Sequence, residues 1–165
     1  MCRDWGLDGD YSKTILRVAR PRSFVLVDAW QFMPDYPRAW YGGGIADGQP
    51  FMDELHAGVL ARFAGHSDVE VVRETSIDAA HAFDDAHFDW VYLDANHSYE
   101  SAVADIRAWI PKIRPGGFLA GDDYVEGRYW FGDAVKRAVD ETAASGTASL
   151  IWTMGDQFIL QVNRP

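Results

Sequence analysis

Acidic side chains stand at the ends of three apolar segments of the chain. Each segment is a short run of branched or aromatic residues, which is typical of a buried strand. The acids that follow these runs are Asp28, Asp94 and the adjacent pair Asp122 and Asp123. Carboxylates gathered at one sheet edge repel each other unless a cation or hydrogen bonds offset their charge, so the pattern indicates a binding or catalytic site. The alternative is that each acid caps the helix that follows it.

The segments that must position these acids alternate between strand-like and helix-like patterns. Strands are expected at residues 24–27, 69–72, 90–93 and 118–120, followed by a hairpin of 149–153 and 158–162. Helical faces are expected from Met52 to Phe63 (including Leu60), over 77–83, from Val103 to Ile113, and over 131–143. The helix after Val103 is expected to stop at Pro115-Gly116-Gly117. Continuous apolar strands are buried on both faces, so the sequence predicts a doubly wound α/β sheet, mostly parallel, with a C-terminal antiparallel hairpin.

Composition bounds the kind of protein. A length of 165 residues suits one domain, 1–165, with one core. The net charge of −10 argues against a nucleic-acid partner, because phosphate binding needs clustered Lys and Arg. No apolar run approaches the roughly 20 residues of a membrane span, and the single cysteine, Cys2, fits a reducing, cytoplasmic compartment. The expected partner is a small molecule, and a homo-oligomer of the chain is a further expectation.

A glycine-containing segment near the N-terminus precedes an expected helix that has Ile15 and Val18 on one face. Gly6 and Gly9 would let the backbone approach a ligand closely at the N-terminus of that helix. Glycines also make ordinary turns, which is the alternative.

Two longer motifs resemble a known family. Residues 88–100 read FDWVYLDANHSYE, and residues 115–124 read PGGFLAGDDY. They resemble class I S-adenosylmethionine-dependent methyltransferases that carry Asp-Gly-x-His-Ser-Tyr-Glu after one strand and Gly-Asp-Asp-Tyr after the next. The likeness extends to Val27-Asp28-Ala29-Trp30 and to residues 131–139. It implies a Rossmann-like methyltransferase fold.

The resemblance also implies roles for individual residues. Asp28 would accept hydrogen bonds from the ribose hydroxyls of S-adenosylmethionine, both of which are donors. The other residues that the resemblance places around the cofactor are Asp4, Gly6, Gly9, Ala29, Trp30, Ser76, Ile77 and Asp94. Asp94 would face the methyl-transfer centre, where a carboxylate suits the positive sulfonium.

His97 is the candidate general base, since an imidazole with an ordinary pKa near 6.5 can take a proton from a hydroxyl at neutral pH. The alternative is that His97 bonds locally at the start of a helix. Some relatives resemble this chain in holding Mg²⁺ with three acids, which here are Asp94, Asp122 and Asp123. Such oxygen ligands suit Mg²⁺, and the ion would lower the pKa of a bound hydroxyl.

The N-terminus departs from the family pattern. Only three residues precede Asp4, which is too few for the central strand of about 5–6 residues that the family places there. The first central strand is therefore expected to be truncated or missing. Three explanations stay open: a start further upstream, a strand supplied by a partner chain, or a degenerate form.

The leading hypothesis for function is an O-directed methyltransferase that acts on a small hydroxylated molecule such as a sugar or natural product. One alternative keeps the metal and changes the reaction to hydroxylation or hydrolysis. The other is a non-catalytic relic that serves as a binding or assembly module.

Overall fold

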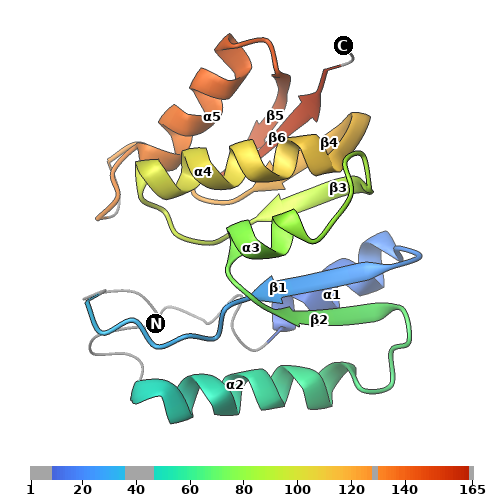
Figure 1. The fold of residues 1–165 in the computed structure, drawn as a ribbon. Coiled ribbons are helices and arrows are strands. Elements are labelled where there is room, and N and C mark those ends of the chain that lie inside the picture. The colour runs from blue at the N-terminus through green and yellow to red at the C-terminus, as the bar shows by residue number, and fades with distance from the viewer. Residues whose placement is uncertain (1–8, 36–46, 128–129, 164–165) are drawn as a thin grey trace. The chain divides into compact units, whose positions relative to one another are not determined.

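The computed structural model describes residues 9–35, 47–127 and 130–163, and the chain forms two compact units, Met1–Thr75 and Ser76–Pro165 (Figure 1). Each unit is described by itself. The single domain expected over residues 1–165 stays a prediction. Asp4, Gly6 and the position of the expected central strand lie outside the described residues.

The first unit pairs two parallel strands with two helices. Its elements are α1 (Asp10–Ala19), β1 (Phe24–Asp28), α2 (Gly48–Phe63) and β2 (Val69–Arg73). Strand β1 runs in register with β2, so that Asp28 lies opposite Arg73 at the carboxyl ends of both strands. The strands expected at 24–27 and 69–72 are confirmed.

The core of the first unit is a cluster of Trp30, Met52, Val59 and Phe63. Leu16 of α1 packs against this cluster. The sequence analysis placed Val18 and Leu60 on the apolar faces of their helices. For these two residues that placement was wrong, because they are 74% and 46% exposed. Each lies on a helix that meets the cluster through other positions, so one apolar residue remains on its solvent side.

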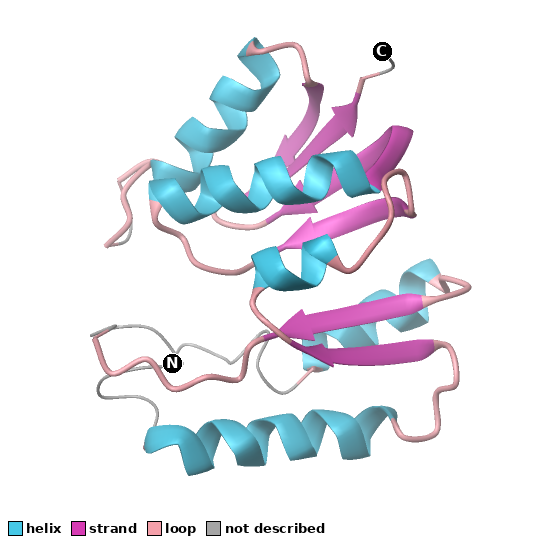
Figure 2. Ribbon diagram, in the orientation of Figure 1, coloured by secondary structure: helices cyan, strands magenta, loops and turns pink. Residues whose placement is uncertain are grey.

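The second unit is built on a four-stranded sheet with the order β3-β4-β6-β5 (Figure 2). Its elements are α3 (Ser76–His81), β3 (Phe88–Leu93), α4 (Tyr99–Trp109), a 3-10 turn (Ile110–Lys112), β4 (Ile113–Gly121), α5 (Ala134–Ala144), β5 (Ala148–Met154) and β6 (Gln157–Val162). Strands β3 and β4 are parallel, whereas β6 is antiparallel to both β4 and β5. The mostly parallel arrangement before a C-terminal antiparallel hairpin is therefore confirmed.

The expected helix stop at Pro115-Gly116-Gly117 was wrong. Helix α4 ends at Trp109, and the three residues lie inside β4. Pro111 explains the early end, because proline has no N–H with which to continue the helical hydrogen bonds, and the chain passes into the 3-10 turn Ile110–Lys112. Gly117 is required by the strand pairing, because a Cβ there would lie 2.5 Å from the Asp89 carbonyl oxygen.

The core of the second unit lies where the sheet meets α4 and α5. Leu119, Leu160, Phe158 and Val139 are its largest fully buried side chains. Glycine is needed at position 121, because a Cβ would lie 2.6 Å from the Leu93 carbonyl oxygen and 2.7 Å from the Phe158 ring. This close approach brings the ends of β3 and β4 together. Among the described helices, none has the length and apolar character needed to cross a membrane.

Candidate functional site

The register of β3 and β4 brings two of the predicted acids to one edge of the sheet. Leu93 pairs with Gly121 as the last residues of these parallel strands. Asp94 directly follows Leu93, and Asp122 directly follows Gly121. The Asp122 N–H donates to the Leu93 carbonyl at 3.3 Å. The carboxyl ends of parallel strands thus supply the acids, as expected from the sequence.

The turn between β3 and α4 positions His97. The Asn96 side chain accepts from the Ser98 N–H at 2.9 Å, and the Ser98 hydroxyl accepts from the Ser101 N–H at 3.3 Å as the N-cap of α4. These local hydrogen bonds satisfy backbone donors at the start of the helix. They fix the turn without using the imidazole. The start of α4 therefore does not require a local hydrogen bond from the His97 side chain, which was the alternative role for this residue.

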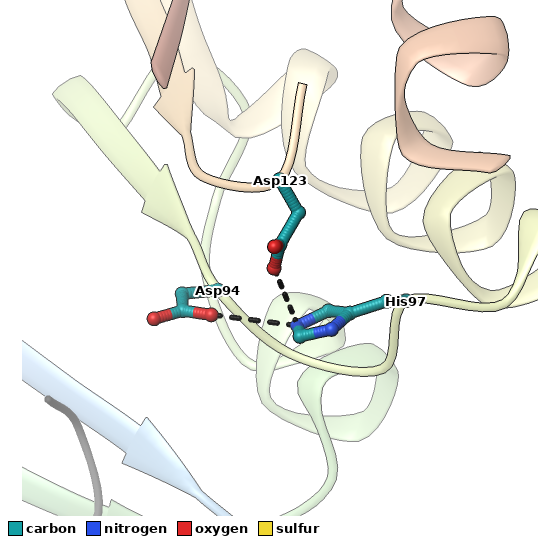
Figure 3. Close-up of side chains that lie close together, drawn as sticks. All are labelled: Asp94, His97 and Asp123. Atoms are coloured by element: carbon teal, nitrogen blue, oxygen red, sulfur yellow. Dashed lines mark ion pairs between the residues drawn. The ribbon is translucent and has the colours of Figure 1, made fainter. Parts of the chain in front are cut away.

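The His97 ring lies between two carboxylates (Figure 3). Its Nε2 is 3.1 Å from Oδ2 of Asp123 and 3.5 Å from Oδ1 of Asp94. Nε2 is buried, and within the described part of the chain neither of these two contacts has the geometry of a hydrogen bond. Both are close contacts between charged groups. Phe131 packs edge-on against the ring with the centroids 4.9 Å apart. The arrangement presents one nitrogen to two acids beside an aromatic wall.

The charges around His97 shift the pKa values of the group. Burial by itself lowers the pKa of His97, but Asp94, Asp123 and Asp122 outweigh it, and the net pKa is raised above 6.5. Burial raises the pKa of Asp123 from 3.8 to about 6, although the nearby His97 opposes the shift. An imidazole and a carboxyl group of pKa about 6 that face each other can exchange one proton, which is the property of an acid–base centre.

Asp123 reaches His97 through an unusual backbone. Its φ is 64°, in the left-handed region that few residues other than Gly, Asn and Asp adopt readily. Its N–H donates to Oδ1 of Asp122 at 2.9 Å. The Asp122 carboxylate therefore bonds the backbone, whereas the Asp123 carboxylate contacts the imidazole. Asp94, His97 and Asp123 each offer a ligand atom within 4.8 Å of the others. The structure thus gathers His97 with two of the three acids that the resemblance assigned to Mg²⁺, and the role of Asp122 as a ligand stays a prediction.

A buried acid beside this group escaped the sequence analysis. Asp105 of α4 is 6% exposed, and burial raises its pKa, although a hydrogen bond from Ser76 opposes the shift. It lines a cavity of about 30 Å³ together with His97 and Asp122. The signal was its place on the apolar face of the helix, since buried Ala102 and Trp109 lie three residues before and four residues after it.

Ser76 and Ile77, which the resemblance placed near the adenine, open α3 in the second unit. The Ser76 hydroxyl accepts from the Trp109 indole N–H at 2.8 Å and also bonds Asp105. These contacts engage the hydroxyl inside the unit. The adenine role of both residues stays a prediction.

In the first unit, Asp28 ends β1 as predicted, and its side chain is half-buried. Burial raises its pKa, against the lowering effects of the Trp30 N–H and of His56. The Trp30 N–H donates to Oδ1 of Asp28 at 2.7 Å. Trp30 is 3% exposed and its indole packs in the core, and the cofactor role that the resemblance gives this residue stays a prediction.

Gly9 is buried at the N-cap of α1 with a φ of 82°. A Cβ there would lie 2.9 Å from the Phe63 ring, so both the conformation and the space require glycine. The close approach that requires glycine here is to Phe63, and the approach of a ligand to Gly9 stays a prediction.

Comparisons with known proteins agree with this architecture. A family model described as a methyltransferase domain matches residues 9–124. Among solved structures, the O-methyltransferase NovP has a TM-score of 0.62 at 21% identity, over 93% of this chain and 66% of its own length. The O-methyltransferase from Bacillus cereus, solved in complex with SAH, has a TM-score of 0.57 at 18% identity, over 94% of this chain and 80% of its own.

The N-methyltransferase NodS from Bradyrhizobium japonicum WM9, solved with S-adenosyl-L-homocysteine, has a TM-score of 0.62 at 12% identity, over 96% of this chain and 76% of its own. No curated protein matches the sequence. The structural likenesses confirm the Rossmann-like fold, and this chain spans 66% of the length of NovP. Because the family model covers more than half of the sequence, the chain belongs to the methyltransferase-domain family of class I S-adenosylmethionine-dependent methyltransferases.

Proposed function

We propose that the chain is an S-adenosylmethionine-dependent O-methyltransferase that acts on a small hydroxylated molecule such as a sugar or natural product. The observation that carries the proposal is the position of His97 Nε2 between the carboxylates of Asp94 and Asp123. O-methylation requires that a hydroxyl lose its proton, and a histidine held by acids is suited to take it. The SAH complex of the Bacillus cereus O-methyltransferase supports the choice of cofactor.

The residues of the first unit fit the cofactor that the family implies. Asp28 ends β1 with one oxygen bonded to the Trp30 N–H, and the second oxygen suits a ribose hydroxyl. Gly9 has the left-handed backbone that a close approach at a helix N-terminus requires. When bound, the cofactor supplies an activated methyl group on a positively charged sulfur. The assigned roles of Asp4, Gly6, Ala29, Ser76 and Ile77 belong to the same proposal.

The proton step belongs to the second unit. His97 and Asp123 take the proton of the acceptor hydroxyl as a pair. Because Nε2 is buried, the proton reaches it by way of Oδ2 of Asp123, 3.1 Å away, and the resulting imidazolium is stabilised by Asp94 and Asp123. Burial of the pair strengthens this stabilisation, since charges interact more strongly away from water. The cost is that His97 acts only above its raised pKa.

Calorimetric titration with S-adenosylhomocysteine is the first test. The purified chain should bind it, and Asp28→Ala should weaken binding by at least about tenfold, the effect of losing a hydrogen bond to a charged group. Methyl transfer to a panel of sugars and phenols should then be lost in His97→Gln while cofactor binding is kept. His66→Gln is the matched control, because His66 also lies near a carboxylate, Asp68, at 3.7 Å but is exposed. A folded chain that gives no heat with S-adenosylhomocysteine would favour the non-catalytic relic.

A metal-dependent reaction is the second candidate, and the proximity of Asp94, His97 and Asp123 favours it. Two carboxylates and one imidazole suit Mn²⁺, Fe²⁺ or Zn²⁺ better than Mg²⁺, which prefers oxygen ligands alone. Mg²⁺ held by Asp94, Asp122 and Asp123 would instead assist methyl transfer by lowering the pKa of a bound hydroxyl. Titration with Mn²⁺ and Mg²⁺ separately distinguishes these two, and His97→Gln should abolish only the binding that uses the imidazole.

A further inference from the structure

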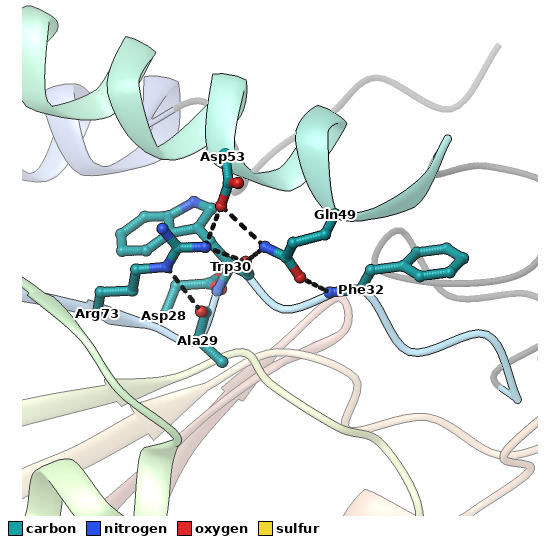
Figure 4. A network of polar contacts seen from close by, with 7 residues as sticks. All are labelled: Asp28, Ala29, Trp30, Phe32, Gln49, Asp53 and Arg73. Atoms are coloured by element: carbon teal, nitrogen blue, oxygen red, sulfur yellow. Dashed lines mark hydrogen bonds and ion pairs between the residues drawn. The ribbon is translucent and has the colours of Figure 1, made fainter.

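We propose that Arg73 is a positioning residue for Asp28: it holds the loop after β1 so that Asp28 presents one carboxylate oxygen to the ribose hydroxyls of the cofactor. This inference rests on the proposed function, in which Asp28 binds the ribose. Arg73 does not touch the reacting atoms. It acts through the backbone of Ala29 and Trp30 (Figure 4).

Arg73 lies directly opposite Asp28 in the register of β1 and β2. Its guanidinium does not point its charge at that carboxylate in any described contact. It donates instead to the Ala29 carbonyl at 3.4 Å, to the Trp30 carbonyl at 2.9 Å and to Asp53. Two successive carbonyls and a carboxylate match the fixed fork of an arginine, which a lysine cannot reproduce.

Gln49 of α2 holds the same loop from the other side. Its amide nitrogen donates to the Trp30 carbonyl at 2.9 Å and to Asp53 at 2.9 Å, and its oxygen accepts from the Phe32 N–H at 2.9 Å. The Trp30 carbonyl thus has two side-chain donors from separate elements (Figure 4). The loop is bonded along its length to α2 and β2.

The restrained backbone is one that Trp30 would not adopt by itself. Its φ is 38°, in the left-handed region that a bulky residue avoids. The Trp30 N–H donates to Oδ1 of Asp28 at 2.7 Å, and the unusual φ relates this N–H to the Trp30 carbonyl that Arg73 and Gln49 hold. The buried indole anchors the loop through its side chain, and Arg73 with Gln49 anchors it through its carbonyl. Release of the carbonyl would let the backbone relax and free Oδ1, which would disorient the acid.

The same side chains border a space for a ligand. A polar depression of about 360 Å³ is lined by Ala29, Gln49, Asp53, Arg73, Glu74 and Thr75. This volume is in the range of small-molecule sites. Since the guanidinium is occupied by the loop and Asp53, its part in that site is to shape the wall rather than to pair with an anion.

The test compares the affinity for S-adenosylhomocysteine with that for its analogue lacking both ribose hydroxyls, by calorimetry. The wild-type chain should prefer the natural ligand on the order of 10- to 100-fold, the value of hydrogen bonds to a charged group. Arg73→Ala should reduce this preference to within about threefold, and Arg73→Lys should give an intermediate value. Arg62→Ala is the matched control, because Arg62 pairs with Asp10 in the same unit but lies outside the network, and its preference should equal that of the wild type.

A second readout needs no ligand. Hydrogen exchange of the Trp30 amide should accelerate at least about tenfold in Arg73→Ala relative to Arg62→Ala, because the bond to Asp28 loosens. If Arg73→Ala does not fold, Gln49→Ala tests the same carbonyl. A wild-type preference that Asp28→Asn abolishes but Arg73→Ala keeps would overturn the positioning role alone. A folded wild-type chain that does not bind S-adenosylhomocysteine, or shows no preference, would overturn the proposed function and this inference with it.

Discussion

Replacement of Asp123 by asparagine should stabilise the protein at alkaline pH. Burial raises the pKa of Asp123 from 3.8 to about 6, so the folded state disfavours its charge. A raised carboxyl pKa means that the folded chain binds more protons than the unfolded chain between these values, and stability falls as the pH rises from 3.8 through 6. Asparagine removes the charge. It also tolerates the φ of 64° at this position, so the substitution brings no backbone penalty.

The size of the effect follows from the shift. The difference between 3.8 and about 6, at about 1.36 kcal/mol for each pKa unit, corresponds to at most about 3 kcal/mol at pH 8. The Asp123 side chain keeps 17% of its surface exposed and faces His97. Solvent screening and the lost contact with the imidazole reduce the expected gain to about 1–2 kcal/mol.

Urea unfolding at several pH values measures this gain. The midpoint of Asp123→Asn should exceed that of the wild type at pH 8, with about half of the gain left at pH 5 and the slope unchanged. Asp85→Asn is the control, since Asp85 is 74% exposed in a surface pair with Lys112, and it should change stability by less than about 0.5 kcal/mol. An equal or lower midpoint for Asp123→Asn at pH 8 would refute the claim that burial dominates the charge of this acid.

Other predictions follow from single side chains. NMR titration of His97 should give a pKa above 6.5, and a pKa below 6.5 would contradict the charge balance. The contribution of His97 to stability is present at low pH and should fade as the pH rises through the pKa of the folded state. Gly121→Ala should lower the free energy of unfolding by about 1–3 kcal/mol or more, because its Cβ meets the Phe158 ring at 2.7 Å. Gly58→Ala, with nothing within 4 Å in α2, should raise it by about 0.5–1 kcal/mol. Leu160→Ala should cost about 2–5 kcal/mol, whereas Leu60→Ala, at a side chain 46% exposed, should cost far less; chemical denaturation ranks all four.

The sequence was sufficient to predict features that depend on periodicity and on strand ends. Parallel strands β3 and β4 end in register, so the acids after Leu93 and Gly121 had to meet. The motif around His97 singled this residue out, and the structure places it beside two of these acids, whereas its role as a base stays a proposal. Which of the two adjacent acids faces the imidazole could not be predicted, because the answer depends on a left-handed backbone at Asp123, and many sequences permit that conformation without requiring it.

Contacts between distant segments were beyond the reach of the sequence. The sequence could not identify Arg73 as a positioning residue. Its proposed role depends on its place opposite Asp28 in the strand register and on hydrogen bonds to carbonyls 43 and 44 residues away in the chain. The early end of α4 shows a different difficulty. Pro115-Gly116-Gly117 is a strong helix breaker, but Pro111 acts first. Gly117 instead allows the close approach of β4 to β3, and Gly116 supplies a φ of 82°.

The two candidate functions compete for one atom. A general base must leave Nε2 of His97 open to the acceptor proton, whereas a metal held by Asp94, His97 and Asp123 would occupy that nitrogen. A bound divalent cation would also reverse the electrostatics, because it favours the charged form of Asp123 that burial now disfavours. Both functions therefore need a neutral imidazole and an ionised Asp123 at the start, and they differ in whether a proton or a cation then occupies the space between the two residues. The raised pKa values of His97 and Asp123 describe the pair as a proton site, and only an ion that binds more strongly than the proton would convert it into a metal site.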